Sequence, residues 1–238
     1  MPHPLKRYLP KNLYSYLRIL KHRRRKSLSQ VGQDFWVFGE AFNGKENGFF
    51  LELGSADGIT LNNTFLLEKR FHWRGICIEP DPESYEELVR VRRVKCLNVC
   101  VDGEEREVAF VHKGLRGGII DYDTDLREEV GKKHNAVKIR TKVLQAILRE
   151  HNAPETIDYF SIDVEGAEDR ILTGFPFSEY RFLCLTVERP KEKLRHVLER
   201  NGYRLIKEVP GLDCFYIHES FASVYQENVY EFWSRYGA

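Results

Sequence analysis

Hydrophobic, strand-like runs alternate with helical segments along most of this chain, and the alternation limits the folds it can adopt. The clearest example is the run FFLEL (Phe49–Leu53), which is followed by a glycine turn at Gly54–Gly58 and a helical pattern at Leu61–Arg70. Strands that alternate with helices form a mostly parallel sheet with helices on both faces. We therefore predict a doubly wound α/β fold.

The rest of the chain continues this pattern. Further strands are expected at Gly75–Ile78, Val94–Val99, Glu107–His112, Ile157–Asp163 and Phe182–Val187. Further helices are expected at Pro82–Arg92, with Asp81 as its N-cap, and at Thr141–Arg149, Glu168–Leu172, Glu192–Asn201 and Ser223–Arg235. The pair Arg204–Val209 and Cys214–His218 resembles a hairpin, which indicates an antiparallel last strand. Residues 114–136 contain four glycines and are expected to form a mobile flap at the ligand-binding edge of the sheet.

Composition and charge restrict the class of protein. The 238 residues suit one α/β domain plus a short extension. The five cysteines contain no CxxC pair, so we interpret them as reduced core thiols. No apolar run approaches the roughly 18 residues of a membrane span. We expect a cytoplasmic protein.

Residues 1–27 form a basic extension that precedes the domain at 28–238. Nine Lys or Arg residues and no acid occur before Asp34, and Leu13, Leu17 and Leu20 share one helical face. A solvated extension packed on the domain is one interpretation. Peripheral contact with an anionic membrane, or with RNA, is the alternative, and the sequence does not choose between them.

The glycine turn has the context of a nucleotide site but an unusual charge. Glu79 ends the second strand 21 residues after Gly58, where an acid binds the two hydroxyls of a ribose. Glu52 and Asp57 in the turn would repel a pyrophosphate, whereas they suit the ammonium and sulfonium of S-adenosylmethionine. We predict that ligand here. The expected contacts comprise Glu52, Gly54, Ser55, Asp57 and Gly58 in the turn, Glu79 and Pro80 at the ribose, and Asn98 and Asp102 at the adenine.

A second acidic cluster follows a later strand, in the stretch YFSIDVEGAEDR. Asp163 and Glu165 emerge at the same edge of the predicted sheet and are candidates for a general base, with Glu188 in reserve. A divalent metal between these carboxylates is conceivable. The cluster has no histidine and no fixed ligand spacing, so we favour a site without metal.

Four segments together resemble a known family. SQVGQD (29–34), FFLELGSADGITLNNT (49–64), WRGICIEPDP (73–82) and IDYFSIDVEGAED (157–169) resemble the FkbM family of S-adenosylmethionine-dependent methyltransferases. The resemblance implies the class I methyltransferase fold, a seven-stranded sheet with an antiparallel last strand. It also implies that Asn63 and Thr64 match the start of the helix after the cofactor turn, and Asn62 stands there in place of a serine. Asp163, Glu165, Gly166 and Glu168 match the family's D-x-E-G-x-E signature.

The expected function is O-methylation of a hydroxyl on a sugar, a glycan or another small metabolite. One alternative is a nucleic acid methyltransferase that uses the basic extension, although Asp163-Val-Glu-Gly stands where amino-methylating enzymes carry Asn/Asp-Pro-Pro-aromatic. Nucleic acid is therefore the less favoured partner. The other alternative is a non-catalytic interaction module with this fold, which the intact Gly54, Gly58 and Glu79 disfavour.

Overall fold

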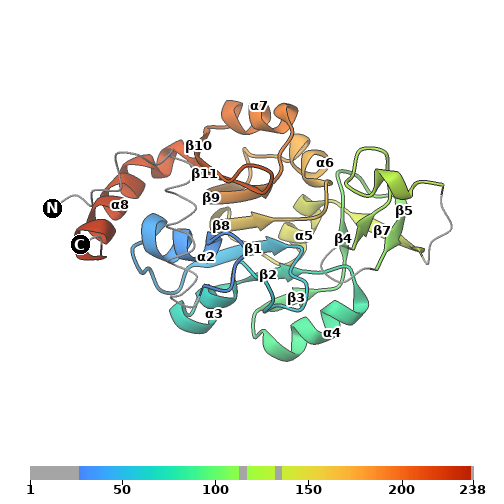
Figure 1. Cartoon of the computed structure of the whole chain (residues 1–238), viewed down its shortest axis with the longest axis horizontal. Helices are drawn as coiled ribbons and strands as arrows, with labels where there is room; N and C mark the ends of the chain where they lie inside the picture. Colours follow the sequence, from blue (N-terminus) through green and yellow to red (C-terminus); the bar gives the residue numbers. More distant parts are fainter. Residues whose placement is uncertain (1–26, 113–116, 132–135, 237–238) are drawn as a thin grey trace.

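A central seven-stranded sheet organises the protein (Figure 1). The computed structural model describes residues 27–112, 117–131 and 136–236, so the predicted helical face at Leu13–Leu20 lies outside the described part. In spatial order the strands are β10 (Tyr203–Glu208), β11 (Asp213–His218), β9 (Arg181–Glu188), β8 (Thr156–Ile162), β1 (Phe49–Leu53), β2 (Arg74–Ile78) and β3 (Lys95–Leu97).

The sheet is mostly parallel, as predicted. Strand β1 pairs in parallel with β2 and β8, β2 with β3, and β8 with β9. Strand β11 pairs antiparallel with both β9 and β10, which confirms the expected hairpin and the antiparallel last strand. The chain leaves β1 toward β2 on one side and returns to β8 on the other. In open sheets of this kind, ligands bind at the carboxyl ends of the strands where the order reverses.

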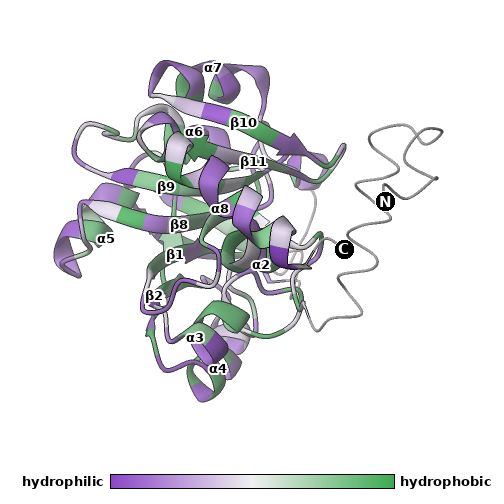
Figure 2. Cartoon of the chain, turned by 90° about the vertical axis from the view of Figure 1, so that its left-hand side faces the viewer, coloured by the Kyte–Doolittle hydropathy of each residue, from purple (hydrophilic) through white to green (hydrophobic). Residues whose placement is uncertain are grey.

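Two hydrophobic layers cover the two faces of the sheet, because residues that alternate along each strand point to opposite faces. Leu51 and Leu53 of β1 pack in the layer that includes α5 (Leu144–Glu150), α6 (Glu168–Thr173) and α7 (Glu192–Arg200). Phe50 packs in the opposite layer with a π-helix, η2 (Trp36–Ala41), and with α3 (Phe65–Phe71), α4 (Pro82–Val91) and α8 (Ala222–Tyr236). Figure 2 shows α8 beside α2 (Gln33–Phe35), which leads into η2. No described helix has the length and apolar character needed to cross a membrane.

A small second sheet corrects part of the prediction. Strands β4 (Cys100–Val101), β7 (Ala136–Lys142), β5 (Glu107–Val111) and β6 (Gly118–Ile119) form a separate unit at one end of the molecule (Figure 1). The expected strand at Glu107–His112 exists but belongs to this sheet. The predicted helix at Thr141–Arg149 begins only at Leu144, because Thr141 and Lys142 pair with β4. The expected flap at 114–136 instead contains β6, the 3-10 turn η4 (Arg127–Glu129) and the first residue of β7, with residues 113–116 and 132–135 outside the described part.

Local hydrogen bonds set where two helices begin. Asp81 caps α4 as predicted, and its carboxylate accepts from the backbone N–H groups of Glu83 and Ser84. Helix α3 begins at Phe65, four residues later than predicted. The Oδ1 atom of Asn62 accepts from the backbone N–H groups of Thr64 and Phe65, which holds the preceding residues in a turn.

Candidate active site

Strand register brings four functional positions into one row across the sheet. Leu53 pairs with Ile162 and Ile162 with Val187, so the residues that follow, Gly54, Asp163 and Glu188, lie at neighbouring strand ends. Asp213 pairs with Glu188 and extends the row to β11. Three carboxylates thus lie beside the glycine turn at the edge where ligands bind.

The turn after β1 requires glycine at its first position. Gly54 has φ +80°, and a Cβ at this position would lie 1.9 Å from the carbonyl oxygen of Asp163. Only glycine accepts both the left-handed backbone and this close approach. The backbone of β8 can therefore pass directly beside the turn.

A cavity of about 640 Å³ opens at this edge, within the usual range of small-molecule sites. Its walls include apolar side chains from both sheets and the adjoining loops: Ile78, Pro80, Val99, Val101, Phe110, Ile119 and Leu126. Of the described residues that line it, six are acidic and Arg189 alone is basic. Such a lining favours a ligand with apolar surface and positive charge.

Glu79 lies at the end of β2 on the wall of this cavity. Its two carboxylate oxygens accept hydrogen bonds from the backbone N–H groups of Ala56 and Asp81, each at 2.8 Å. These bonds fix the carboxylate and leave further lone pairs for a ligand. Burial, with a smaller effect from the charges of Asp81 and Glu52, raises the pKa of Glu79 to about 7.

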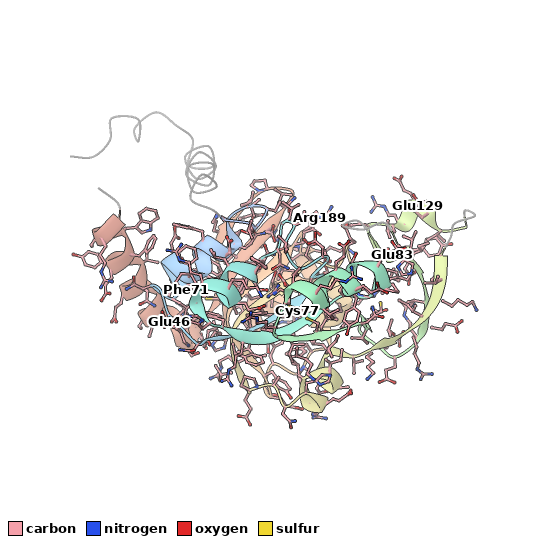
Figure 3. All side chains as sticks on the ribbon, turned by 90° about the horizontal axis from the view of Figure 1, so that it is seen from below. Glu46, Phe71, Cys77, Glu83, Glu129 and Arg189 are labelled. Carbon is pink, nitrogen blue, oxygen red and sulfur yellow. The ribbon has the colours of Figure 1, made fainter. Side chains whose placement is uncertain are left out.

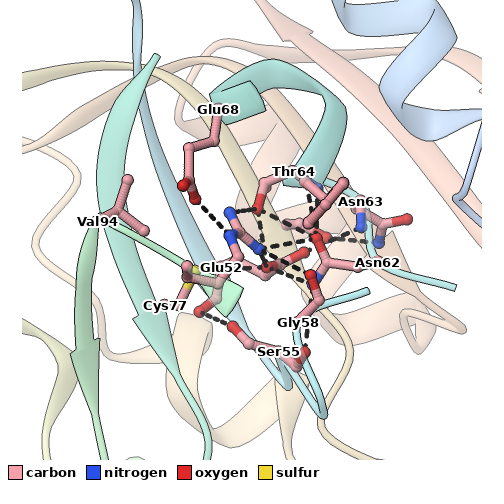
Figure 4. Close-up of polar contacts among 12 residues, drawn as sticks. Glu52, Ser55, Gly58, Asn62, Asn63, Thr64, Glu68, Cys77 and Val94 are labelled. Carbon is pink, nitrogen blue, oxygen red and sulfur yellow. Dashed lines mark hydrogen bonds and ion pairs between the residues drawn. The ribbon is translucent and has the colours of Figure 1, made fainter. Parts of the chain in front are cut away.

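Glu52 belongs to a buried network behind the turn (Figure 4). Its carboxylate accepts from the side chains of Asn62 and Thr64, both at 2.9 Å, and from the backbone N–H of Asn63. The fully buried Arg92 lies 3.6 Å from Glu52 and donates to Glu68, Asn62 and Thr64. This network holds the turn in place, and Cys77, in the interior in Figure 3, also contacts Glu52.

The far end of the cavity carries the second acidic cluster. Burial and the like charge of Glu188 raise the pKa of Asp163 well above its usual value. The same two causes raise the pKa of Glu165 to about 6. The Nη2 atom of Arg189 lies 2.6 Å from Asp125, 2.7 Å from Glu188 and 3.4 Å from Glu165. One guanidinium therefore joins carboxylates from three segments.

The loop after β6 is docked on this cluster. The backbone N–H of Asp125 donates to the carbonyl of Glu165 at 3.0 Å. Gly166 has φ +98°, and a Cβ there would lie 2.6 Å from the backbone nitrogen of Asp125. This second glycine-dependent contact holds Asp125 and Leu126, which belong to the expected flap, on the cavity wall.

Comparison with known families decides the identity. Residues 52–205 match the model of the methyltransferase FkbM domain, which spans more than half of the chain. The chain belongs to the FkbM methyltransferase family. This methyltransferase depends on S-adenosylmethionine, and its strand order is that of the class I fold predicted above. No curated protein sequence matches it significantly.

Solved methyltransferase structures resemble this one at a low level. A methyltransferase from Pyrococcus furiosus is 14% identical, with a TM-score of 0.40, over 87% of this chain and 94% of the other. Fibrillarin from Aeropyrum pernix, in complex with natively bound S-adenosyl-L-methionine, is 15% identical, with a TM-score of 0.44, over 79% and 74%. The assignment rests on the family match, because similarity this low carries no functional information.

The residues of the cavity fit the cofactor. Its apolar wall between Pro80 and Phe110 suits an adenine, and the fixed carboxylate of Glu79 suits a ribose. The Oδ1 atom of Asn63 is buried and has no hydrogen-bond partner among the described residues, while its Nδ2 donates to Ser161. A buried acceptor without a donor is costly, and the ammonium of the cofactor offers one.

Four predicted cofactor residues lie outside this cavity lining. The carboxylate of Asp57 accepts from the backbone of Ile59 and Thr60 in its own turn. Asn98 donates to the backbone oxygens of Glu79 and Pro80, and thus supports the cavity from behind.

The other two also have structural partners. The carboxylate of Asp102 binds Arg106 and Arg170. The carbonyl oxygen of Gly58 accepts from Arg92. The acids that face the cavity are therefore Glu79 and the cluster around Asp163, rather than Asp57. Glu52 does line the cavity, but its carboxylate is already bonded within the network behind the turn.

Sequence reasoning missed several cavity residues. Gln30 and Gln33 line the end opposite the adenine wall, and Gln33 donates to Asp213 at 3.0 Å. Gly211 and Leu212, from the turn between β10 and β11, complete that end. The segment SQVGQD (29–34) contains both glutamines, but only the tertiary fold places them beside the turn of residues 209–212.

Arg189 also escaped the sequence analysis. It follows β9 directly and has φ +40°, a left-handed conformation that is uncommon for a residue with a side chain. Uncommon backbone conformations of this kind concentrate at functional sites. The position of Arg189 before Pro190 was the one sequence signal of an unusual backbone here, since a residue before proline is restricted in conformation.

Proposed function

We propose that this methyltransferase transfers a methyl group to a hydroxyl oxygen of a sugar, a glycan or another small metabolite. The observation that carries the proposal is the convergence of Asp163, Glu165 and Glu188 at the end of the cavity, beside the Gly54 turn. A hydroxyl must lose its proton when its oxygen is methylated, and a carboxylate beside it can accept that proton. Asp163 is the first candidate for this base and Glu165 the second.

The environment of Asp163 suits proton transfer. The cofactor supplies an activated methyl group on its sulfonium when bound. The enzyme's own residues orient the acceptor and take up its proton. Burial and the neighbouring Glu188 make ionised Asp163 a stronger base than an exposed aspartate, because both disfavour its negative charge. Asp163 therefore holds an accepted proton more firmly than an exposed aspartate would.

The charge of the cavity supports a neutral or cationic acceptor. Six acidic residues and one arginine line it among the described residues. A phosphodiester backbone would be repelled from such a lining. The nucleic acid alternative would have to rely on the basic segment 1–26, which lies outside the described residues, to overcome that repulsion.

A matched set of variants tests the proposal. An acceptor is first sought by screening sugars, glycans and small metabolites with cofactor that carries a labelled methyl group. Asp163→Asn and Glu165→Gln are then compared with Glu83→Gln, an exposed acid on α4. At least one of the first two should lose about 10²–10⁴-fold in turnover, the usual contribution of a positioned base.

Cofactor affinity by calorimetry separates chemistry from binding. It should stay within a few-fold of wild type in all three variants. Unchanged turnover in both Asp163→Asn and Glu165→Gln would remove these carboxylates from the chemistry. If RNA were methylated and none of the screened hydroxyl compounds were, the nucleic acid alternative would replace the proposal.

A further inference from the structure

Three carboxylates converge at the end of the cavity, with Asp163 and Glu188 on its lining and Glu168 outside the lining. Asp163, Glu168 and Glu188 each offer one oxygen, and the three oxygens all lie within 4.8 Å of one another. They come from the end of β8, the first residue of α6 and the end of β9. Glu168 is 2% exposed and Glu188 is 8% exposed, so water screens their charges poorly. We call these residues the inner trio.

One oxygen of the inner trio is buried without a partner. The Oε1 atom of Glu188 pairs with Arg189 at 2.7 Å, but Oε2 is buried and has no hydrogen-bond partner in the described part of the chain. A buried carboxylate oxygen without a donor or cation is strongly unfavourable. Asp163 and Glu168 form no ion pair with any described Lys, Arg or His. A ligand that brings positive charge would satisfy all three residues.

The adjoining carboxylates show how such a group is satisfied. Asp125, Glu165 and Glu188 form an outer trio with the same oxygen spacing. The Nη2 atom of Arg189, a residue labelled in Figure 3, contacts all three carboxylates of this trio. The inner trio shares Glu188 with the outer one, and Arg189 contacts neither of its other two members.

We propose that the inner trio binds a divalent cation that prefers oxygen ligands, such as Mg²⁺ or Ca²⁺. Carboxylate oxygens from three elements at this spacing can share the coordination sphere of one ion. Three carboxylates, one arginine and one divalent ion sum to zero charge. Glu168 does not line the cavity, so a bare ion reaches the trio more readily than the ammonium of a bulky acceptor.

The ion has a use in the proposed reaction. Asp163 also borders the cavity next to Gly54, so an ion on its carboxylate can hold the acceptor hydroxyl and increase its acidity. This use rests on the proposed function, whereas binding of the ion does not. With Asp163 bound to the ion, the second candidate base, Glu165, which is outside the inner trio, accepts the proton.

Binding of the divalent ion to the protein is measured directly, in the absence of cofactor and acceptor. The full chain is stripped with EDTA, and Mn²⁺ is titrated at pH 8 while free Mn²⁺ is followed by electron paramagnetic resonance. We expect one site, competed by Mg²⁺ or Ca²⁺. Glu188→Gln and Asp163→Asn should each raise the Kd about tenfold or more, because each removes a charged ligand. Asp125→Asn is the matched control from the outer trio and should stay within about threefold.

Two results would overturn the inference. Wild-type protein that binds no Mn²⁺ at millimolar concentration would show that the inner trio does not hold a divalent ion. If Asp125→Asn raised the Kd for Mn²⁺ as much as Glu188→Gln does, the inner trio would not be the site of the ion. Melting temperatures in EDTA report whether each variant folds. We also expect Mn²⁺ to raise the melting temperature of the wild-type protein but not that of Glu188→Gln. The affinity of the wild-type protein for the cofactor, measured in EDTA, tests the proposed function separately. Absence of cofactor binding under these conditions would refute that function, whether or not the protein binds Mn²⁺.

Discussion

The carbonyl oxygen of Asp163 occupies the place that a side chain at Gly54 would need, 1.9 Å from the position of a Cβ. The cofactor turn and the strand that carries the candidate base are therefore in direct backbone contact. The contact is reinforced by a hydrogen bond from the backbone N–H of Asp163 to the carbonyl of Leu53, at 3.2 Å. Any change at Gly54 consequently acts on both halves of the site.

Gly54→Ala should weaken cofactor binding by more than about tenfold. The methyl group would push β8 away from β1, and overpacking of this kind costs about 1–3 kcal/mol. Gly44→Ala is the matched control, because Gly44 has a similar φ of +82° but no atom within 4 Å of its Cβ position. It should lose some stability through backbone strain alone and keep full cofactor affinity by calorimetry. Equal affinity in both variants would contradict this prediction.

Arg92→Met should strongly destabilise the protein. The guanidinium is fully buried and lies between Glu52 and Glu68, so its removal leaves the buried Glu52 without a cation and Glu68 with Lys69 alone. Such losses cost about 3–5 kcal/mol in the free energy of unfolding, measured by urea denaturation. Arg90→Met removes a surface arginine that pairs with Glu86 at 3.4 Å, and should change stability by less than about 0.5 kcal/mol. Similar losses in the two variants would argue against the buried network.

Cofactor affinity should depend on pH through Glu79. Its pKa is about 7 in the free protein, and a ribose that donates hydroxyl hydrogens favours the ionised carboxylate. Below pH 7 a proton must first leave, so affinity should fall by up to about tenfold for each pH unit. Calorimetry from pH 5.5 to 8.5 checks the slope. Glu79→Gln should bind more weakly and lose this pH dependence, and a slope unchanged in the variant would assign it to another group.

Stability in EDTA should decrease as pH rises from about 5 to 8. Burial raises the pKa of Glu168 to about 8 from an ordinary value of 4.5, so the folded state holds a proton that the unfolded state has released. Its stabilising effect is complete below pH 4.5 and is lost as pH rises through 8, at up to about 1.4 kcal/mol per pH unit. Urea unfolding of Glu168→Gln should show a shallower decrease. Glu208→Gln is the control, because the pKa of Glu208 is lowered and its effect lies at more acidic pH.

Local sequence signals were sufficient for most elements of the main sheet. The run Phe49–Leu53 is the strand β1 as predicted, and Asp81 caps α4 as its position before Pro82 indicated. These features depend on side-chain alternation and on hydrogen bonds within a few residues, which a sequence records directly. The same signals failed at Thr141 and Lys142, because pairing with β4 overrode their local preference.

By itself, the sequence determined the order of strands and helices, the glycine turn, and which acids follow which strands. Only the tertiary structure decided what those acids contact. Glu52 is bonded within the turn network, and Asp57 caps its own turn, whereas Asp163, Glu168 and Glu188 meet. Their distances depend on strand register and on the approach of β8 to Gly54, which join residues more than a hundred positions apart. The sequence shows which residues are charged, but the packing of distant segments determines which partners they contact.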